Sequence, residues 1–243
     1  MRITQIWRYP VKSLQGERLE SADVDAKGLV GDRRWALFDR GTTNGLTARR
    51  VPELLMACGV WHGDGQVSVR LPDGTETADD DELSRWLGRE VELRSAAEIE
   101  RAPVYENPSD ATDEDGAPWV EWRGPRGRFH DSTRTMVSIC SEASLASVGV
   151  PLGEVRRFRF NLVVDGEGED ALVGRHLSIG DVELEAMKRI DRCVMVTRPQ
   201  PDGIGRDLDV LKRINAARDG HLGIGTLVRS PGRVRVGDEL VPL

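Results

Sequence analysis

The sequence predicts a mostly β protein with a few short helices, an α+β chain whose strands close into a barrel. Short apolar and β-branched runs recur along it, many alternating with polar residues as half-buried strands do. Turn signals such as Pro72-Asp-Gly74 and Pro231-Gly232 separate these runs. The expected strands are Ile3 to Val11, Trp35 to Phe38, Val67 to Leu71, Val91 to Leu93, Thr135 to Cys140, Asn161 to Val164, Val182 to Met187, Val194 to Thr197 and Val234 to Val236.

Three segments have the spacing and end signals of helices. Residues 79–88 begin with acids and place apolar residues at i, i+3 and i+4, and residues 207–218 repeat such a stripe. Residues 141–149 begin with the capping residue Ser141 and stop at a glycine. A helix start leaves backbone N–H groups that can hold an anion, so Ser141, with Ser144 one turn in, is a candidate phosphate contact; simple capping is the alternative.

Composition limits the function classes. The 243 residues, 39% of them hydrophobic, suffice for one large domain or two small ones. No apolar run approaches the ~20 residues of a membrane span, and no signal peptide pattern is seen, so we expect a cytoplasmic protein without a membrane partner. The net charge of −7 argues against nucleic acid as a partner.

We expect an N-terminal β subdomain over residues 1–100, a loop or linker over 101–127 and a barrel over 128–243, neither part independent of the other. The linker assignment rests on residues 106–118, which are rich in Asn, Pro, Asp and Gly and almost lack apolar anchors.

Cys193 is the most informative cysteine. The three cysteines are widely spaced and the four histidines scattered, so neither a disulfide framework nor a zinc site is expected. Lys188, Arg189 and Arg192 surround Cys193 in sequence and would lower the pKa of its thiol, favouring the thiolate that acts as nucleophile or soft-metal ligand. A thiol that merely fills the core is the alternative.

Six short motifs, in order, resemble those of the MOSC family, in particular the amidoxime-reducing component of mitochondria and its bacterial relatives. They are Trp7-Arg-Tyr-Pro-Val-Lys-Ser-Leu14, Gly28-Leu-Val-Gly-Asp-Arg-Arg-Trp35, Leu46-Thr-Ala-Arg-Arg50, Ser141-Glu-Ala-Ser-Leu145, Arg157-Phe-Arg-Phe-Asn161 and Asp191-Arg-Cys193. Residues 223–239 also look like that family's closing strands. The resemblance covers nearly the whole chain and implies a MOSC-type β-barrel with an N-terminal MOSC-N subdomain.

The resemblance implies binding of the molybdenum cofactor. Cys193 would ligate molybdenum as a thiolate, which suits a soft-ligand metal site. The residues that match the family's cofactor-binding motifs are Lys12, Ser13, Arg33, Ser144, Arg159 and Asn161. From its place in the Leu46-Thr-Ala-Arg49 segment, Arg49 would add a positive charge to the same pocket. Ser141 would add the backbone N–H groups of the helix that it caps. Asp191 would relay protons or simply pair with Arg192, and pairing is the simpler interpretation.

The implied activity is reduction of an N-hydroxylated or N-oxide type small molecule. The sequence lacks a cysteine cluster for an iron–sulfur centre, so electrons would come from a separate donor of the ferredoxin or cytochrome type. Two departures from the family pattern bear on substrate preference: Phe160 replaces the usual proline, and Arg198-Pro-Gln-Pro-Asp-Gly203 replaces the acidic run after the cysteine.

Other functions stay open at this point. Cys193 could carry sulfur as a persulfide, which needs no metal. The protein could also carry the cofactor without catalysis, or be a β-barrel interaction protein with a core cysteine. A phosphate-binding cationic cluster favours the cofactor hypotheses, because a sulfur carrier has no evident use for one.

Overall fold

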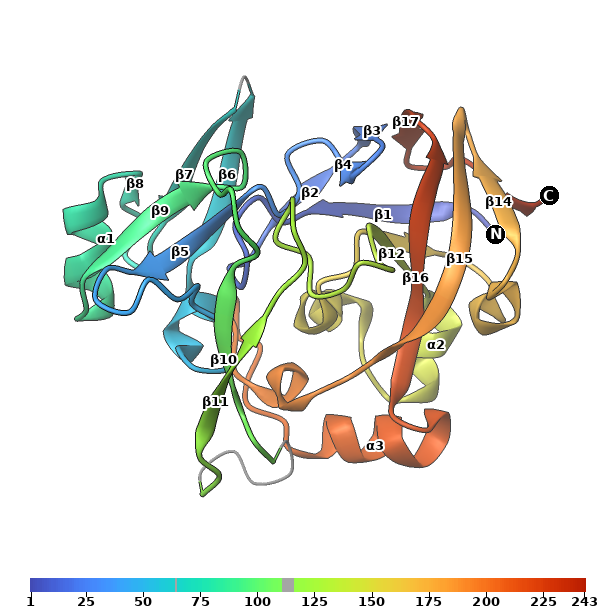
Figure 1. Ribbon diagram of the computed structural model, residues 1–243. Coiled ribbons are helices and arrows are strands. Elements are labelled where there is room, and N and C mark those ends of the chain that lie inside the picture. The colour runs from blue at the N-terminus through green and yellow to red at the C-terminus, as the bar shows by residue number, and fades with distance from the viewer. Residues whose placement is uncertain (64, 111–115) are drawn as a thin grey trace.

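A curled eight-stranded sheet joins the two ends of the chain (Figure 1). The computed structural model describes residues 1–63, 65–110 and 116–243. In spatial order the sheet contains β18 (Leu240–Pro242), β14 (His176–Ile179), β15 (Val182–Asp191), β16 (His221–Ser230), β12 (Val137–Ser141), β13 (Leu162–Val164), β1 (Ile3–Arg8) and β2 (Glu17–Leu19). Its neighbours pair antiparallel except β12 and β13, which are parallel. The predicted mostly β fold is confirmed.

The first strands of the chain pair with the last ones. β1 lies between β13 and β2, and β17 (Gly232–Arg235) pairs with β3 (Ser21–Asp25), which pairs in turn with β4 (Gly28–Leu29). Residues 1–29, which the sequence places in an N-terminal subdomain, therefore hydrogen-bond mainly to the C-terminal part. The boundary at residue 100 stays a prediction.

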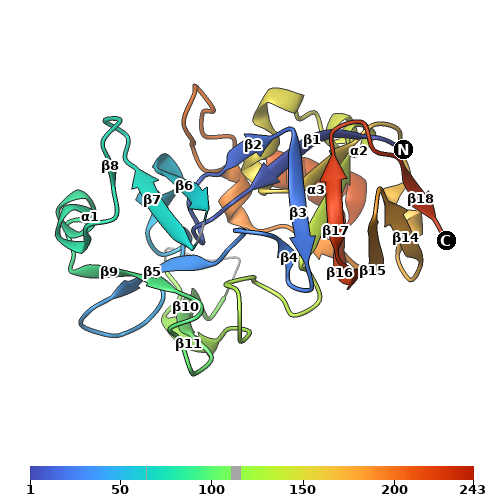
Figure 2. The same cartoon turned by 90° about the horizontal axis from the view of Figure 1, so that it is seen from above.

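A separate β lobe follows (Figure 2). β5 (Trp35–Asp39) pairs with β9 (Val91–Ser95), while β6 (Cys58–Gly63), β7 (Gln66–Arg70) and β8 (Glu76–Thr77) form a three-stranded sheet. Helix α1 (Asp80–Leu87) and the 3₁₀ helix η1 (Pro52–Met56) complete it.

The predicted linker contains regular structure. β10 (Val104–Pro108) and β11 (Trp119–Arg123) form an antiparallel hairpin between the β lobe and the large sheet (Figure 1). The prediction of an irregular loop over 106–118 is therefore wrong for residues 106–108, which belong to β10, and confirmed for residues 109–110 and 116–118. Residues 111–115 lie outside the described residues. Tyr105 of β10 is buried and packs against the half-buried Trp122 of β11, and both residues lie outside the segment 106–118 on which the linker prediction rests.

The three predicted helices are present, as α1, α2 (Glu142–Ser147) and α3 (Asp209–Arg218). Asp79 caps α1 by accepting hydrogen bonds from the N–H groups of Asp81 and Glu82 (3.0 and 2.9 Å). Ser141 caps α2 in the same way. The 3₁₀ helices η2 (Leu152–Phe158) and η3 (Glu169–Leu172) add short connections. Within the described residues, no helix combines the length and apolar character needed to cross a membrane.

The segment after Cys193 is a correction. Residues 194–197, predicted as a strand, form the 3₁₀ helix η4 (Val194–Thr197), with Cys193 at its N-cap in extended conformation. The strand before this segment, β15, is longer than predicted and runs to Asp191. Its pairing with β16 carries register shifts at Ala186/Lys188 and Arg189/Asp191. Such bulges bend a strand and re-aim its side chains.

Apolar packing divides among separate clusters. One fills the curled sheet and includes Ile3, Val24 and Leu29 of the N-terminal strands beside Ile224. A second fills the β lobe around Leu37, Leu55 and Leu83. A third lies under α2 and α3, around Phe160. Because the first cluster draws on both ends of the chain, the sheet cannot be completed by residues 128–243 alone.

Replacing the cap of α1 tests how far this helix depends on its first turn. We expect Asp79→Ala to lower the free energy of unfolding by about 1 kcal/mol, because two backbone N–H groups lose their acceptor. Asp81→Ala, which removes a first-turn carboxylate that caps nothing, should cost only a few tenths. Urea denaturation of both variants measures this, and equal losses would contradict it.

Candidate functional site

One pocket of about 450 Å³ lies where the curled sheet, the β lobe and the hairpin meet. It is lined by Lys12, Ser13, Arg33, Thr47, Ala48, Arg49, Leu55, Asn107, Trp122, Phe129, His130, Asp131, Ser132, Thr135, Ser138, Arg157, Phe158, Arg159, Asn161, Lys188, Ile190, Asp191, Arg192, Cys193, Met195 and Val196. Eight of the ten residues predicted for the site are among them. The two exceptions are Ser141 and Ser144.

The turn after β1 delivers Lys12 and Ser13. Ser13 has φ of 69°, and its hydroxyl accepts a hydrogen bond from the Ala48 N–H (3.0 Å), which fastens this turn to the Leu-Thr-Ala-Arg segment. The Lys12 ammonium pairs with Asp131 and lies 4.8 Å from the centre of the Tyr105 ring. Lys12 is thus already neutralised by a carboxylate at the pocket.

Asp131 is a site residue that sequence reasoning missed. The Asp131 side chain is exposed, and the Lys12 ammonium beside it, with Arg33 and Arg159 further away, lowers the pKa of its carboxyl to about 2. It is therefore ionised at neutral pH. No local signal marks it, because it lies 119 residues from Lys12 in sequence.

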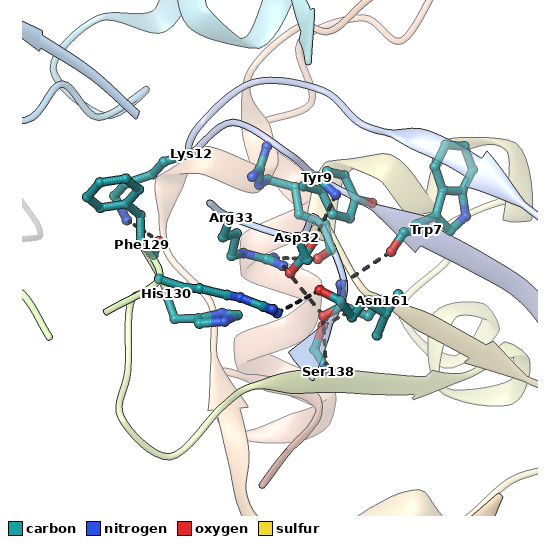
Figure 3. A network of polar contacts seen from close by, with 12 residues as sticks. Trp7, Tyr9, Lys12, Asp32, Arg33, Phe129, His130, Ser138 and Asn161 are labelled. Carbon is teal, nitrogen blue, oxygen red and sulfur yellow. Dashed lines mark hydrogen bonds and ion pairs between the residues drawn. The ribbon is translucent and has the colours of Figure 1, made fainter. Parts of the chain in front are cut away.

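Arg33 is held by an acid, an amide and a carbonyl (Figure 3). Its guanidinium pairs with Asp32 and donates to Asn161 Oδ1 (3.5 Å) and to the Arg159 carbonyl (3.0 Å). Burial lowers the pKa of Arg33, but the fully buried Asp32 outweighs it and raises that pKa above its ordinary value. Asp32 also accepts from the Tyr9 N–H (2.7 Å), so one carboxylate fixes both Arg33 and the start of the Lys12 turn.

Asn161 is almost entirely occupied by the protein. Its Oδ1 accepts from the Ser138 N–H and hydroxyl (both 3.1 Å), and its Nδ2 donates to the Trp7 carbonyl (3.2 Å), as Figure 3 shows. These bonds tie β1, β12 and the start of β13 together. Asn161 lines the pocket as predicted, but its side chain serves first to hold Arg33 and the strands.

Arg159 retains an unused hydrogen-bond donor. It has φ of 56° at the end of η2, and its guanidinium stacks on Tyr9 at 4.5 Å from the ring centre. Its Nη1 is buried and makes no hydrogen bond to the described residues. Burial, together with Arg33, lowers the pKa of Arg159 to about 10, so the group is charged at neutral pH. A buried cationic donor without an acceptor is costly, and an anion in the pocket would satisfy it.

Cys193 lies on the pocket wall and is exposed to it. The prediction of a lowered thiol pKa is wrong: desolvation by the surrounding protein raises the pKa of Cys193, and the opposing effects of Arg49 and Arg192 are too small to reverse this. Arg192, adjacent in sequence, instead donates to the carbonyls of Leu222 and Phe158 and stacks on Phe160 at 4.3 Å.

The predicted pairing of Asp191 with Arg192 is wrong. Its carboxylate takes Lys188 Nζ (2.9 Å) and His221 Nε2 (3.0 Å), and not Arg192. The hydrogen bond from Lys188 lowers the pKa of Asp191, although partial burial opposes it. A proton-relay role stays a prediction. Arg49 lines the pocket as predicted, and its carbonyl accepts from Arg198 (3.2 Å).

Ser141 and Ser144 are not brought to the pocket. The Ser141 hydroxyl accepts from the Ser144 N–H (3.1 Å) and donates to the fully buried Glu169 (2.6 Å). A carboxylate already occupies the start of α2, so the structure gives it a capping role in place of the predicted anion contact. Within the described residues, no group of three or more His, Cys, Asp or Glu side chains is arranged to hold a metal ion.

The comparisons agree with this geometry. The model described as the MOSC N-terminal beta barrel domain matches residues 1–105, and the model described as the MOSC domain matches residues 126–241. The chain belongs to the MOSC family. The human mitochondrial amidoxime-reducing component 1 is 26% identical to this MOSC protein over 97% of this chain and 81% of the human protein.

Two further similarities are more limited. A molybdenum cofactor sulfurase from Drosophila willistoni is 27% identical over 93% of this MOSC chain, which spans about a third (31%) of that protein. The crystal structure of the YuaD protein from Bacillus subtilis has a TM-score of 0.47 and 14% identity, covering 98% of this chain and 93% of that one.

The capping assignment in this MOSC protein can be tested with Ser141→Ala. We expect the free energy of unfolding to fall by about 2–3 kcal/mol, because the helix loses its cap and buried Glu169 loses a donor. Molybdenum and pterin per folded molecule should not change. Chemical denaturation and cofactor analysis measure the two quantities, and loss of cofactor from folded Ser141→Ala would restore the phosphate-contact prediction.

His130 should make stability depend on pH. Burial and Arg33 lower its pKa to about 4, whereas an unfolded histidine titrates near 6.5. The unfolded state therefore takes up the proton first as pH falls, and about 3 kcal/mol of stability is lost between pH 6.5 and 4. His130→Gln should lack this loss, whereas His176→Gln, at an exposed position, should keep it. Urea midpoints across this range, on cofactor-free protein, measure it; equal slopes in all three proteins would contradict it.

Proposed function

We propose that this MOSC protein binds the molybdenum cofactor and reduces N-hydroxylated or N-oxide type small molecules. The observation that carries the proposal is the buried, unpartnered Nη1 of Arg159, which lines the same pocket as the exposed thiol of Cys193. An anionic group and a soft metal joined in one ligand would engage both. The names of the relatives support the two parts of the proposal separately: one is a molybdenum cofactor sulfurase, and the other an amidoxime-reducing component.

The residues present fit this cofactor in charge and in ligand type. Arg159 offers the free donor for a phosphate, with Arg33 beside it across the Tyr9 ring (5.3 and 4.5 Å to the ring centre). The turn with Ser13 and the Arg49 segment border the same cavity and would hold the pterin. Cys193 would bind molybdenum as a thiolate, and metal binding would supply the drive to lose the proton that burial retains.

The cofactor would supply two-electron oxygen-transfer chemistry, and the chain would bind, orient and shield it. Arg192 closes the wall behind Cys193, because its guanidinium is fixed by the Phe158 and Leu222 carbonyls. Asp191 pairs with Lys188 at the same wall, and this ion pair fixes the position of the Lys188 ammonium beside the cavity. Electrons would come from a separate redox protein of the ferredoxin or cytochrome type.

A sulfur-carrier role would use Cys193 without metal. Its exposure to the pocket suits a persulfide, but the raised pKa of its thiol disfavours the thiolate that attacks a sulfur donor. A cofactor carrier without catalysis would use the same pocket and differ only in lacking turnover. Molybdenum content distinguishes a sulfur carrier from a molybdenum-binding protein.

Cys193→Ala should abolish metal ligation. We expect wild-type protein from a cofactor-competent host to contain about one molybdenum per chain and the variant at least tenfold less, because the proposed protein ligand is gone. Elemental analysis and pterin release measure this. Cys58→Ala is the matched control, since Cys58 is a half-buried thiol outside the pocket, and should keep its metal. Folded wild-type protein without molybdenum or pterin would contradict the proposal and favour the sulfur carrier.

A further inference from the structure

The β10–β11 hairpin supplies an aromatic wall to the pocket. Asn107 of β10 and Trp122 of β11 line the cavity, and both residues lie in the segment between the two matched domains. Neither side chain carries a positive charge, so this side of the pocket offers an amide and an indole in place of guanidinium groups.

The Trp122 indole is held in a fixed orientation. With the Asn107 amide turned so that its nitrogen donates to the Glu106 carbonyl (3.1 Å), its oxygen accepts from Trp122 Nε1 (2.9 Å). Tyr105, the cross-strand partner of Trp122, supports the indole with its ring centre 5.3 Å away and its plane tilted by 35°. A ring fixed in this way loses little rotational entropy when a ligand stacks on it.

Tyr105 is locked in turn. Its ring lies between Gly45 and Gly124, where a Cβ atom would approach ring carbons to 2.4 and 2.6 Å, so only glycine fits on either side. The Lys12 ammonium lies over the same ring. Tyr105 therefore contacts both Trp122 of the hairpin and Lys12 of the turn after β1. This shared contact fixes the position of Trp122 relative to Lys12.

We propose that Trp122 is a specificity-determining residue that selects flat, aromatic substrates over compact aliphatic ones at the same site. The inference rests on the proposed function for the reacting group and adds the class of molecule that carries it. A planar π system gains offset or edge contacts with a fixed indole, whereas an aliphatic group of small area gains little. The Trp122 indole selects substrates by stacking, and a change at Trp122 leaves the arginine and lysine side chains of the pocket in place.

Matched probes separate stacking from recognition of the reacting group. Benzamidoxime and acetamidoxime share that group and differ in the ring. Equilibrium dialysis on the holoprotein should show benzamidoxime binding weakened roughly five- to tenfold by Trp122→Ala and less than threefold by Trp122→Phe, with acetamidoxime within twofold in both. Trp119→Ala is the control: Trp119 stacks on Arg50 at 4.4 Å and does not line the pocket, so binding should not change.

The outcomes identify which proposal fails. Equal loss of both probes in Trp122→Ala, or an equal effect of Trp119→Ala, would overturn the stacking role and leave the proposed function intact. Undiminished benzamidoxime binding by folded Trp122→Ala would do the same. Wild-type protein that carries molybdenum but binds neither probe would overturn the substrate class in both proposals. Protein that lacks molybdenum but shows the predicted pattern would overturn only the proposed cofactor chemistry.

Discussion

The site depends on interactions that stabilise the charged form of buried arginine side chains. Arg33, Arg159 and Arg192 all lie where burial disfavours the charged form, and it lowers the pKa of the last two to about 10. The protein compensates in three ways: Asp32 pairs with Arg33, backbone carbonyls accept from Arg192, and the rings of Tyr9 and Phe160 stack against the guanidinium planes. Only at Arg159 is the compensation incomplete. The pocket is therefore built to receive an acceptor at one defined point, with its other cations already satisfied.

This arrangement requires the two ends of the chain to fold together. Asn161 joins β1 to β12 through Trp7 and Ser138, and Asp32 joins Tyr9, directly after β1, to Arg33. Trp7 and Arg33 lie 154 and 128 positions from Asn161 in sequence, so the cationic side of the pocket forms only when β1 has entered the curled sheet. Satisfied buried networks of this kind specify one arrangement of strands, since a displaced strand would leave several polar groups without partners. Packing of Ile3 against the C-terminal strands acts in the same direction.

Much of the fold and part of the site could be predicted from the sequence. Alternation identified β5, β7 and the start of β15, and capping residues located α1 and α2, because these signals are local. Three-dimensional proximity decided the rest. The thiol pKa of Cys193 was misjudged because desolvation outweighs the nearby positive charges, and Lys188 in addition pairs with Asp191. Asp131 carried no local signal, and the loop predicted from residue 106 onward overlapped β10 because Asn107 and Pro108 are typical loop residues that nevertheless pair with β11.

The pocket walls divide the work between segments that can change independently. The C-terminal sheet and the first turn carry the cations and the thiol, whereas the hairpin carries the aromatic wall. Tyr105 links them, because its ring centre lies 4.8 Å from the Lys12 ammonium and 5.3 Å from the Trp122 ring centre. A substitution at Trp122 therefore changes the shape of the cavity but removes none of the positively charged side chains that line it. A substitution at Tyr105 would disturb both, because the glycine-lined slot that receives its ring would be left partly empty. Under the proposed function, substrate preference can change through Trp122 while the residues proposed to hold the cofactor stay the same, provided that Tyr105 is kept.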